Sequence, residues 1–584
     1  MSCYFRAVAA DYDGTLTVGA RPTETVLAAV RAQRGRGVRV VLLTGRILPE
    51  LRADFPTVEL EFDAIVGENG AVLWTPLAGE RLLAAPVAPA LDQRLRAAGI
   101  PFRRGAVILA TDARYDQTVL GQIAQMHLGC QLSYNREALM ILPAGISKGT
   151  GLFEALGELA ISHHSTVGIG DAENDHSLLE FCELGVAVSN AVPSLQDRAD
   201  VVLREPDGVG VATFLQGPIL RGELRVRPRR WSIEVGSDPG GERVLLPASQ
   251  TNMLVVGGSA TGKSYLAGLL VERLAAKGYS VCVLDPEGDH VTLGELRGVM
   301  AVGGAEGMPS ADRLATLLRH RFGSVVVDMS RLCGEEKRRY GQSYLIALQH
   351  LRREYGVPHW TLVDEAPQLL SSEALSGICG TASQGWCLVT HRPQDLPPAT
   401  LEQMDVVLVV PGGEPLVAGL ATGRFGAPLG PGEEPLLLGE ALWLEPGHRV
   451  RFRTGARQRP HVRHWHKYLS SELPAGKRFY FRTAHGPTGA VAGNLVEFHH
   501  QLQWAEASVL EHHLAGGDFG RWLGSVVRDP VMAEAARAVE QDLRDRRIDS
   551  EAARQRMLTA IEERYAAESP GGLDPDAERV LTPK

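Results

Sequence analysis

Two glycine-containing motifs, each directly after an apolar run, constrain the fold of this chain more than any other feature. The first is Asp11-Tyr12-Asp13-Gly14-Thr15, which follows Val8-Ala9-Ala10. The second is Gly257-Gly258-Ser259-Ala260-Thr261-Gly262-Lys263-Ser264, which follows Met253-Leu254-Val255-Val256. Polar residues at the exit of a buried strand are typical of ligand sites in α/β sheets. We therefore expect two α/β domains, each with a phosphate-handling site at the carboxyl end of a strand.

Composition narrows the class of protein. A chain of 584 residues has room for about three to five domains. The net charge of −9 disfavours a mainly electrostatic nucleic-acid binder, although a local basic groove is compatible with it. The seven cysteines include no Cys-x-x-Cys pair, which fits a reducing cytoplasm. No signal peptide is visible and no apolar run reaches the ~18 residues of a membrane span, so we expect no membrane association.

The first 217 residues alternate short apolar strands with amphipathic helices, which predicts βαβ units and a parallel sheet. Strands are expected at residues 6–10, 38–43 and 165–169. The segment from about 80 to 145 has strands of its own, at 106–110 and 138–142. It lies between two catalytic motifs, so we expect an inserted α/β cap.

The rest of the chain divides into four parts. Residues 218–244 are expected to be a linker with short strands, and residues 245–470 a second α/β domain. Its strands are predicted at 252–256, 280–285, 324–328, 361–364, 386–390 and 405–410. Residues 471–568 predict an α-rich C-terminal domain, and 569–584 have the composition of a disordered tail. The arginines near the linker form either a solvated face or a contact with nucleic acid or an acidic partner; they are Arg221, Arg225, Arg227, Arg229 and Arg230.

The first motif belongs to a set of four that together suit phosphoryl transfer. Thr44 ends the second strand, Lys148 lies at a helix start, and Gly170-Asp171-Ala172-Glu173-Asn174-Asp175 leaves a later strand. Clustered carboxylates repel one another unless a hard cation such as Mg²⁺ lies among them. A carboxylate can also be the nucleophile that forms an aspartyl-phosphate.

In these four motifs the chain resembles the haloacid dehalogenase (HAD) superfamily of phosphatases. The resemblance implies that Asp11 is the nucleophile and Asp13 the general acid/base, while Thr44 and Lys148 hold the phosphoryl group. It also implies a Mg²⁺ site formed by Asp11, the Asp13 carbonyl, Asp171 and Asp175, which Asn174 supports. The string Val66-Gly67-Glu68-Asn69-Gly70-Ala71 and the cap position resemble the Cof-like (type IIB) branch, which hydrolyses small phosphomonoesters, often sugar phosphates. Four motifs in order favour this interpretation over turn-forming aspartates or an inactive HAD fold.

The second motif has the strand–loop–helix context of a nucleotide-binding P-loop. Lys263 is expected to reach the β- and γ-phosphates of ATP, and Ser264 to ligate Mg²⁺. The apolar strand that ends in Asp364-Glu365 is typical of a Walker B motif, in which Asp364 holds Mg²⁺ indirectly and Glu365 polarises water. Residues 386–390 are expected to form a strand between the two Walker strands, with a γ-phosphate sensor at its end. A glutamate after the Walker B aspartate favours ATP hydrolysis over a kinase.

Residues 245–468 resemble the HerA/FtsK-type ATPases, which are ring-forming RecA-like motors. The resemblance includes Leu284-Asp285-Pro286-Glu287-Gly288-Asp289 and Thr390-His391-Arg392-Pro393-Gln394-Asp395, where the family commonly has Gln in place of His391. It implies a homo-hexamer and an arginine donated by a neighbouring subunit, for which the candidates are Arg392, Arg451, Arg453 and Arg457. It implies the following nucleotide-binding residues: Gly257, Ser259, Ala260, Thr261, Gly262, Lys263, Ser264, Asp364, Thr390 and His391.

The C-terminal region has three features of interest. For the basic run at residues 459–468 three roles are open: lining a pore, contacting an anionic partner, or closing the ATPase domain, of which the last is favoured. Adjacent histidines, His499-His500 and His512-His513, point to different helix faces, so solvated or capping roles are favoured over a metal site. The stripe Phe519, Trp522, Leu523 and Val526 has helical spacing and predicts a core face.

Together these motifs predict a bifunctional enzyme: a Mg²⁺-dependent phosphomonoester hydrolase joined to a hexameric ATPase that could act on DNA or RNA. A first alternative is a sugar-phosphate phosphatase regulated by an oligomerising P-loop domain. A second is a nucleic-acid end-processing phosphatase and kinase. Glu365 argues against the kinase, and a Cof-like cap would hinder a polymer end from entering the phosphatase site.

Overall fold

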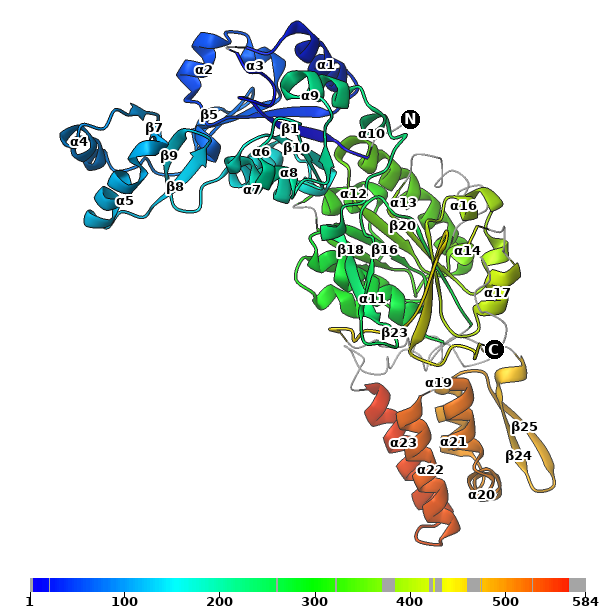
Figure 1. Ribbon diagram of the computed structural model, residues 1–584. Coiled ribbons are helices and arrows are strands. Elements are labelled where there is room, and N and C mark those ends of the chain that lie inside the picture. The colour runs from blue at the N-terminus through cyan, green and yellow to red at the C-terminus, as the bar shows by residue number, and fades with distance from the viewer. Residues whose placement is uncertain are drawn as a thin grey trace. The chain divides into compact units, whose positions relative to one another are not determined.

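Mostly apolar strands form the N-terminal sheet, as expected. The computed structural model describes residues 4–19, 21–258, 261–320, 323–369, 384–419, 424–425, 433–459, 473, 475–527 and 529–566. Eight strands run in the order β12-β11-β10-β1-β2-β3-β4-β5, parallel from β12 to β3 and antiparallel beyond (Figure 1). They are β1 (Ala7–Asp11), β2 (Arg39–Leu43), β3 (Ala64–Gly67), β4 (Val72–Thr75), β5 (Gly79–Leu82), β10 (Thr166–Gly170), β11 (Leu184–Ala187) and β12 (Val201–Val202). β1 and β10 are buried throughout, as parallel strands covered on both faces must be.

Helices cover this sheet in the manner of a parallel α/β fold. α1 packs with α9, and α6 packs with α7 (Figure 1). The helices are α1 (Glu24–Gly35), α2 (Leu48–Asp54), α3 (Val58–Glu61), α6 (Lys148–Glu158), α7 (His176–Phe181), α8 (Pro193–Gln196), α9 (Asp207–Leu215) and α10 (Pro218–Arg221).

The inserted cap has its own antiparallel sheet and its own core. The sheet has the order β6-β7-β9-β8, and two helices pack with it. The elements are β6 (Arg103–Arg104), β7 (Leu109–Asp112), β8 (Cys130–Asn135), β9 (Ala138–Pro143), α4 (Pro89–Ala97) and α5 (Asp116–Gln125). The strand expected at 106–110 begins at Leu109, because the backbone N–H groups of residues 106–108 bond to Glu68 instead of joining the ladder. The cap elements begin at Pro89, since β5 still belongs to the main sheet.

The second sheet carries the P-loop strand near its middle. Its order is β14-β13-β23-β22-β21-β15-β20-β19-β16-β18-β17, parallel from β21 to β17 and antiparallel before. The parallel strands are β15 (Met253–Val256), β16 (Val281–Asp285), β17 (Val299–Gly303), β18 (Ser324–Asp328), β19 (Trp360–Val363), β20 (Trp386–Thr390) and β21 (Val406–Val409). β20 lies between the P-loop strand β15 and the Walker B strand β19, which confirms the expected position of the sensor strand.

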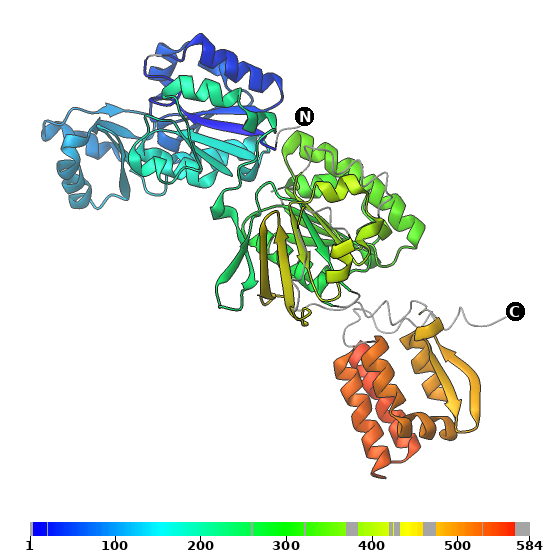
Figure 2. The ribbon, with the colours of Figure 1, turned by 45° about the vertical axis from the view of Figure 1, so that its right-hand side comes forward.

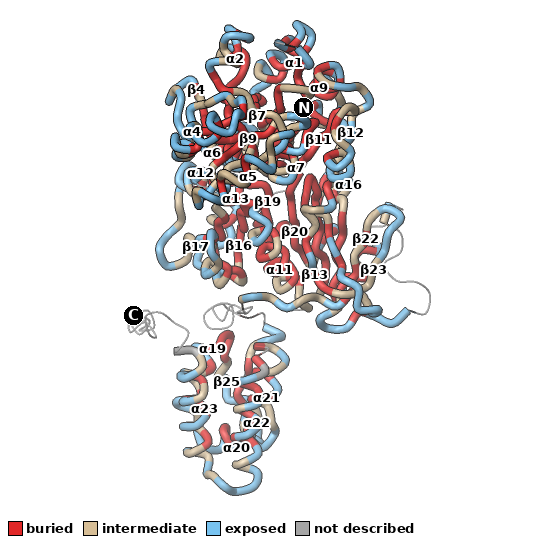
Figure 3. Tube along the Cα trace, turned by 60° about the vertical axis from the view of Figure 1, so that its left-hand side comes forward, coloured by how far each residue is buried: buried red, intermediate tan, exposed pale blue. Residues whose placement is uncertain are grey.

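Helices and two apolar cores lie on this second sheet, whose strands hold the buried residues seen in Figure 3. The helices are α11 (Lys263–Ala276), α12 (Ala311–Arg319), α13 (Gly334–Tyr355), α14 (Ala366–Leu369), α16 (Pro398–Glu402) and α17 (Glu414–Gly419). The antiparallel strands are β13 (Ile233–Ser237), β14 (Arg243–Leu246), β22 (Glu440–Glu445) and β23 (His448–Thr454). The predicted α/β class, with two α/β domains, is thereby confirmed.

The expected linker differs from the prediction, because its strands β13 and β14 join the second sheet and its arginines make internal ion pairs. Arg225 lies 3.0 Å from Asp405, and Arg227 lies 2.9 Å from the same carboxylate. Arg230 pairs with Asp200 of the first domain. These three arginines therefore fasten the segment to its neighbours, and neither a solvated face nor a nucleic-acid contact describes them.

The two α/β domains meet through the N-terminal ends of their strands. His164, just before β10, places Nδ1 2.7 Å from Glu183 and Nε2 3.0 Å from the carbonyl of Lys277. The hydroxyl of Tyr279, just before β16, donates to Glu183 at 3.0 Å. All of these strands run away from the junction, so the carboxyl ends of the two sheets face in different directions.

The C-terminal unit, residues 462–584, contains a hairpin and helices around an aromatic core (Figure 2). Phe519, Trp522 and Leu523 are buried in this core and Val526 packs against it, as their spacing predicts. Among the helices that the structure describes, none combines the length and hydropathy of a membrane span. The elements are β24 (Phe479–Thr483), β25 (Gly486–Ala492), α19 (Leu495–Trp504), α20 (Ala507–Gly516), α21 (Asp518–Trp522), α22 (Pro530–Arg544) and α23 (Ser550–Ala566). Most of the basic run at 459–468 and the predicted tail lie outside the described residues.

Candidate functional site

Three aspartates converge at the carboxyl edge of the first sheet. Asp11 is the last residue of β1, and Asp171 directly follows β10, the strand paired with β1. Asp175 lies in the next turn. One oxygen from each carboxylate lies within 4.8 Å of the other two, and all three side chains are buried. Such a set of hard oxygen donors fits Mg²⁺, which would offset their mutual repulsion.

Lys148 completes this cluster from the N-terminus of α6. Its Nζ lies 2.5 Å from Asp11 Oδ1 and 2.6 Å from Asp175 Oδ1, with no exposed side-chain area. Burial alone would lower the pKa of Lys148, but the charges of Asp11 and Asp175 outweigh it and raise the pKa above the ordinary value. Burial and the charge of Asp175 raise the pKa of Asp11 well above its usual range. Oδ2 of Asp11 is buried without a hydrogen bond among the described residues, which leaves it available to attack phosphorus or to bind a cation.

The predicted acid/base, Asp13, is held by an arginine for which no role was predicted. Arg46 Nη2 lies 2.5 Å and Nε 2.9 Å from the Asp13 carboxylate, and the guanidinium also stacks over the Tyr12 ring. Thr44 is fully buried at the end of β2, where its hydroxyl accepts from the backbone N–H of Arg46. The signal was present, because Arg46 follows Thr44 by two residues in the same strand exit.

Close packing around Asp171 explains the glycine of the first motif. Gly14 has φ +84°, and a Cβ there would lie 2.3 Å from Asp171 Oδ2. The hydroxyl of Thr15 donates to Asp171 Oδ1 at 2.9 Å. Asn174 donates to the side-chain oxygen of Asn69 at 2.9 Å, which links the last motif to the Cof-like string. The four motifs thus occupy one site.

Two further residues, for which no role was predicted, connect the cap to this site. Glu68 is buried and accepts three backbone N–H bonds from residues 106–108, at 2.7, 2.8 and 3.0 Å. Arg136, in the turn between β8 and β9, donates through Nη2 to Asp171 Oδ2 at 2.6 Å. Glu68 lay in the Cof-like string, whereas a long-range contact such as that of Arg136 leaves no local sequence signal.

A second site lies at the carboxyl edge of the other sheet. Lys263 begins α11, and its Nζ donates to the carbonyl of Gly258 at 2.8 Å, as does the Thr261 hydroxyl at 2.9 Å. Gly262 has φ +108° and Ser264 lies in the first turn of α11. Gly257 follows β15, whereas Ser259 and Ala260 lie outside the described residues. The described part of this loop has the form expected of a phosphate-binding loop.

Walker B and sensor residues meet beside this loop. Asp364 and Glu365 follow β19, and Thr390 is the buried last residue of the adjacent β20. His391 Nδ1 lies 2.9 Å from Glu365 Oε2. The structure therefore brings the predicted water-polarising glutamate together with the residue that departs from the family pattern.

His290, which the sequence analysis did not identify, braces the Walker B aspartate. Its Nε2 lies 2.9 Å from Asp364 Oδ2, while the other oxygen of Asp364 accepts from the backbone N–H of Glu365. Burial would raise the pKa of Asp364, but the bond to His290 and its charge, the Glu365 N–H bond and the charge of Lys263 together outweigh burial and lower the pKa. Asp285 accepts backbone N–H bonds from residues 288–290, and burial raises its pKa to about 8. These bonds make Asp285 and His290 structural supports of the loop. Asp285 belongs to the quoted family string, and His290 lies one residue beyond it.

The candidates for an arginine acting on a neighbouring subunit differ in their surroundings. Arg457 is buried and lies 3.1 Å from the buried Glu272 of α11, so it is committed within its own subunit. Arg451 pairs with Glu440 at 2.5 Å, and Arg392 pairs with Asp395 at 3.3 Å. Arg453 is exposed on β23. Arg457 is therefore removed from the set.

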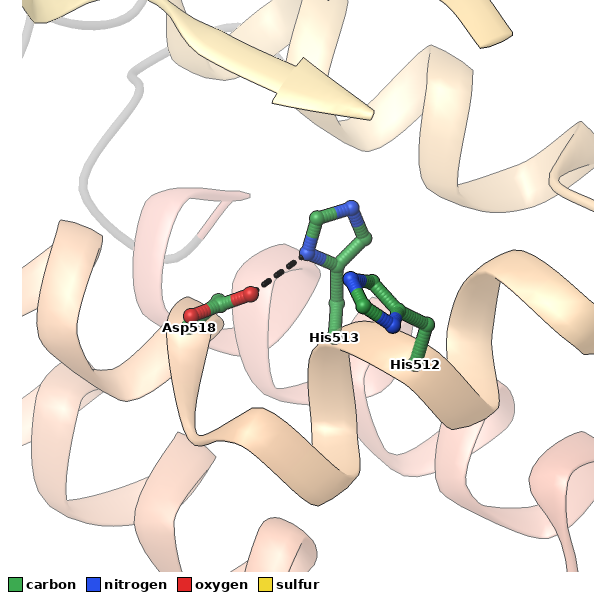
Figure 4. A group of neighbouring side chains, drawn as sticks. All are labelled: His512, His513 and Asp518. Carbon is green, nitrogen blue, oxygen red and sulfur yellow. Dashed lines mark hydrogen bonds and ion pairs between the residues drawn. The ribbon is translucent and has the colours of Figure 1, made fainter. Parts of the chain in front are cut away.

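One histidine of the His512-His513 pair, His513, makes structural bonds within the C-terminal unit. His513, His512 and Asp518 lie close enough to suggest a metal site, and Figure 4 shows only His513 turned toward Asp518. Nδ1 of His513 lies 2.8 Å from Asp518, and Nε2 accepts from the backbone N–H of Arg482 at 2.8 Å. Both ring nitrogens are thus engaged, and the buried His513 joins β24 to α21, a role that differs from the solvated or capping one predicted.

Comparison with known proteins agrees with the two α/β domains. Residues 109–215 match the family model of haloacid dehalogenase-like hydrolases, and residues 248–336 match the helicase HerA central domain. A phosphoglycolate phosphatase of Archaeoglobus fulgidus is 30% identical over 217 residues, which are 36% of this chain and 96% of that protein. One of Natronomonas pharaonis is 32% identical over 211 residues, 33% of this chain and 89% of that protein. A solved haloacid dehalogenase-like hydrolase of B. subtilis is 19% identical, covering 36% of this chain and 99% of that one, with a TM-score of 0.31.

The N-terminal fold and its buried carboxylate cluster define a phosphatase-type hydrolase. More particularly, the chain belongs to the haloacid dehalogenase-like hydrolases and carries, in addition, a HerA central domain.

Proposed function

We propose that residues 1–217 hydrolyse a small phosphomonoester through an aspartyl-phosphate on Asp11. The observation that carries this proposal is the buried cluster of Lys148 with Asp11, Asp171 and Asp175. A bound Mg²⁺ would supply positive charge for the phosphoryl oxygens. Its ligands would come from the same three aspartates.

The side chains of this site have separable roles in the proposed reaction. The unpartnered Oδ2 of Asp11 attacks phosphorus, and the bond from phosphorus to the leaving oxygen breaks. Asp13 protonates that leaving oxygen and later takes a proton from the water that hydrolyses the aspartyl-phosphate. Lys148 and Thr44 bind the phosphoryl oxygens, and Arg46 orients the Asp13 carboxylate.

The cap favours a small substrate. Glu68 fastens residues 106–108 to the main domain, and Arg136 reaches over Asp171 from the hairpin turn. A site bridged on two sides admits a short ester more readily than a polymer end. The related phosphoglycolate phosphatases act on a molecule of this size, so we propose a phosphoglycolate-like ester, with sugar phosphates as the second candidate class.

For residues 245–470 we propose ATP hydrolysis. Support comes from the phosphate-binding loop at Lys263, the position of β20 between the two Walker strands, and the contact of His391 with Glu365. The HerA match extends the proposal to a ring-forming hexamer that acts on DNA or RNA. The alternative, a phosphatase regulated by an oligomerising P-loop domain, predicts an ATPase rate that no nucleic acid changes.

The junction between the domains disfavours the end-processing alternative. β10 and β11 of the first domain and β16 of the second start beside the cluster around Glu183, and the two sites lie at the opposite, carboxyl ends of the sheets. At ~3.3 Å per strand residue, the two sites lie roughly 30 Å or more apart. One nucleic-acid end therefore cannot occupy both, and any coupling must pass through the junction.

Activity measurements on matched variants test these proposals. Asp11→Asn is expected to lower hydrolysis of p-nitrophenyl phosphate and phosphoglycolate by at least ~1,000-fold, because the nucleophile is lost while the shape is kept. Lys263→Ala is expected to abolish ATP hydrolysis and leave this phosphatase reaction intact, and serves as the control. Full phosphatase activity of Asp11→Asn would overturn the first proposal. Absence of ATP hydrolysis in the wild-type protein, with and without DNA or RNA, would overturn the second.

A further inference from the structure

We propose that Arg136 determines substrate specificity by binding a carboxylate on the leaving part of the phosphomonoester. The inference rests on the proposed phosphatase function and names the class of ester that the site selects. Arg136 lies in the turn between β8 and β9, and its guanidinium extends from the cap onto the catalytic edge. Nη2 donates to Asp171 Oδ2 at 2.6 Å and to the Asn190 carbonyl at 3.0 Å, and the backbone N–H donates to Glu173 at 3.0 Å.

The turn itself indicates that the side chain is needed. Asn135 and Ala138 are the last paired residues of the hairpin, so Arg136 and Glu137 form a two-residue turn. Arg136 has φ +52°, a conformation in which such turns usually have glycine, asparagine or aspartate. An arginine here is unfavourable for the turn alone. Its side chain therefore has a role beyond chain reversal.

The other cationic side chains near the site already have carboxylate partners. Lys148 is fully buried between Asp11 and Asp175, and Arg46 holds Asp13. Within the described cap, the guanidinium groups that have carboxylate partners elsewhere are those of Arg103 with Glu50, Arg104 with Asp92, and Arg114 with Asp112. The Arg136 side chain is about half exposed, at 49%, so a ligand can approach it from the cap side.

Asp171 links Arg136 to catalysis. The carboxylate that Arg136 now holds also belongs to the predicted Mg²⁺ set, so a bound cation and the guanidinium compete for its charge. When the Asp171 carboxylate binds Mg²⁺, the Arg136 guanidinium needs another anionic partner. The phosphoryl group is taken by Lys148 and Thr44, which leaves the far end of the substrate beneath the cap. A carboxylate there matches the planar fork of an arginine.

Paired substrates and paired variants test this inference. Phosphoglycolate and ethyl phosphate differ in the carboxylate, so the ratio of their kcat/KM values measures its recognition. Arg136→Gly suits the turn conformation and is expected to lower kcat/KM for phosphoglycolate about 10- to 100-fold, mainly through KM, with little change for ethyl phosphate. Arg136→Lys is expected to recover part of the preference, because it keeps the charge and loses the fork. An equal loss for both esters, or no loss for phosphoglycolate, would overturn the assignment.

A binding measurement separates this inference from the phosphatase proposal. Phosphoglycolate binding, with Mg²⁺ present, is measured by calorimetry in Asp11→Asn and in Asp11→Asn/Arg136→Gly. The measurement does not require either variant to hydrolyse the ester. We expect affinity at least ~10-fold lower in the double variant. Equal affinities would refute the role of Arg136 even if the wild-type enzyme is active. Loss of binding together with an inactive wild type would leave Arg136 as the carboxylate site and overturn the phosphatase reaction alone.

Discussion

Nδ1 of His391 lies 2.9 Å from Oε2 of Glu365, across the boundary between β20 and β19. Glu365 also has φ +44°, so its backbone leaves the Walker B strand in the left-handed region. The histidine thus holds the carboxylate at the edge of the P-loop. His391, at the position where the family resemblance predicts a glutamine, is therefore the residue in contact with the glutamate.

The first prediction concerns this pair. Glu365→Gln is expected to slow ATP hydrolysis by ~100-fold or more while ATP still binds, because the carboxylate that would polarise water is lost. His391→Gln keeps a polar group and is expected to retain most activity, whereas His391→Ala leaves Glu365 unsupported and should cost about tenfold. Steady-state ATPase rates and nucleotide binding measured on the same preparations check this. Equal rates for His391→Ala and the wild type would show that the contact has no part in hydrolysis.

The second prediction concerns attachment of the cap. Glu68→Ala removes the acceptor of the backbone N–H groups of residues 106–108, of which the first is partly buried and the other two are buried. We expect the free energy of unfolding of the N-terminal domain to fall by about 2–4 kcal/mol and the KM for the phosphomonoester to rise. Glu154→Gln, in an exposed ion pair with Arg81, is the matched control and should change neither. Denaturant titration and kinetics check both, and an unchanged KM would separate cap attachment from substrate binding.

The part of this structure that could be predicted from sequence is the part set by local chemistry. Strands such as β15 and β21 are uninterrupted apolar runs, and each catalytic motif lies at a strand exit or helix start. Contacts made across the fold could not be predicted in this way. His290 reaches Asp364 over 74 positions, and Arg136 reaches Asp171 over 35.

The arginines at residues 225–230 show the same limit. As a string they predict an exposed basic surface, because a sequence shows charge without showing its partners. In the fold, Arg225 and Arg227 meet Asp405, which lies about 180 positions away. Ion pairing over such a separation depends on how the strands assemble.

The third prediction concerns Arg457 and Glu272. Glu272 accepts from the Arg457 guanidinium and from the backbone N–H groups of Gln458 and Arg459, with no exposed side-chain area. Arg457→Ala leaves this carboxylate buried without its cation, so we expect the P-loop domain to lose about 3–5 kcal/mol of stability. Arg457→Met/Glu272→Leu removes both charges and should recover much of the loss. Chemical denaturation of the three proteins provides the measurement.

The exposed Arg453 is the control for this third prediction. An arginine that acts on a neighbouring subunit affects ATP hydrolysis without affecting the fold. If Arg453 has that role, Arg453→Ala lowers the ATPase rate at unchanged stability. A stable but inactive Arg457→Ala protein would instead restore Arg457 as a candidate.

The fourth prediction is a pH dependence of the domain junction. His359, 2% exposed, precedes β19, and its Nδ1 accepts the backbone N–H of Ser280 at 2.8 Å. Burial, reinforced by the charges of His164, His163 and Arg352, lowers the pKa of His359 well below its ordinary value. In the unfolded chain the pKa is about 6.5, so below that pH the unfolded state binds more protons than the folded state. The stability due to neutral His359 is therefore complete above pH ~6.5 and is lost as the pH falls toward the folded pKa.

His359→Asn tests this directly, because an asparagine oxygen can replace Nδ1 as the acceptor and does not titrate. Between pH 6.5 and 5 the free energy of unfolding of the wild type is expected to fall more steeply than that of the variant, by up to about 1.4 kcal/mol per pH unit for one proton. Above pH 7 the two curves should run parallel. Chemical denaturation across this range gives the difference, in which the other histidines cancel. Parallel curves at every pH would mean that His359 takes up its proton equally in both states, and the junction would then have to be accessible to water.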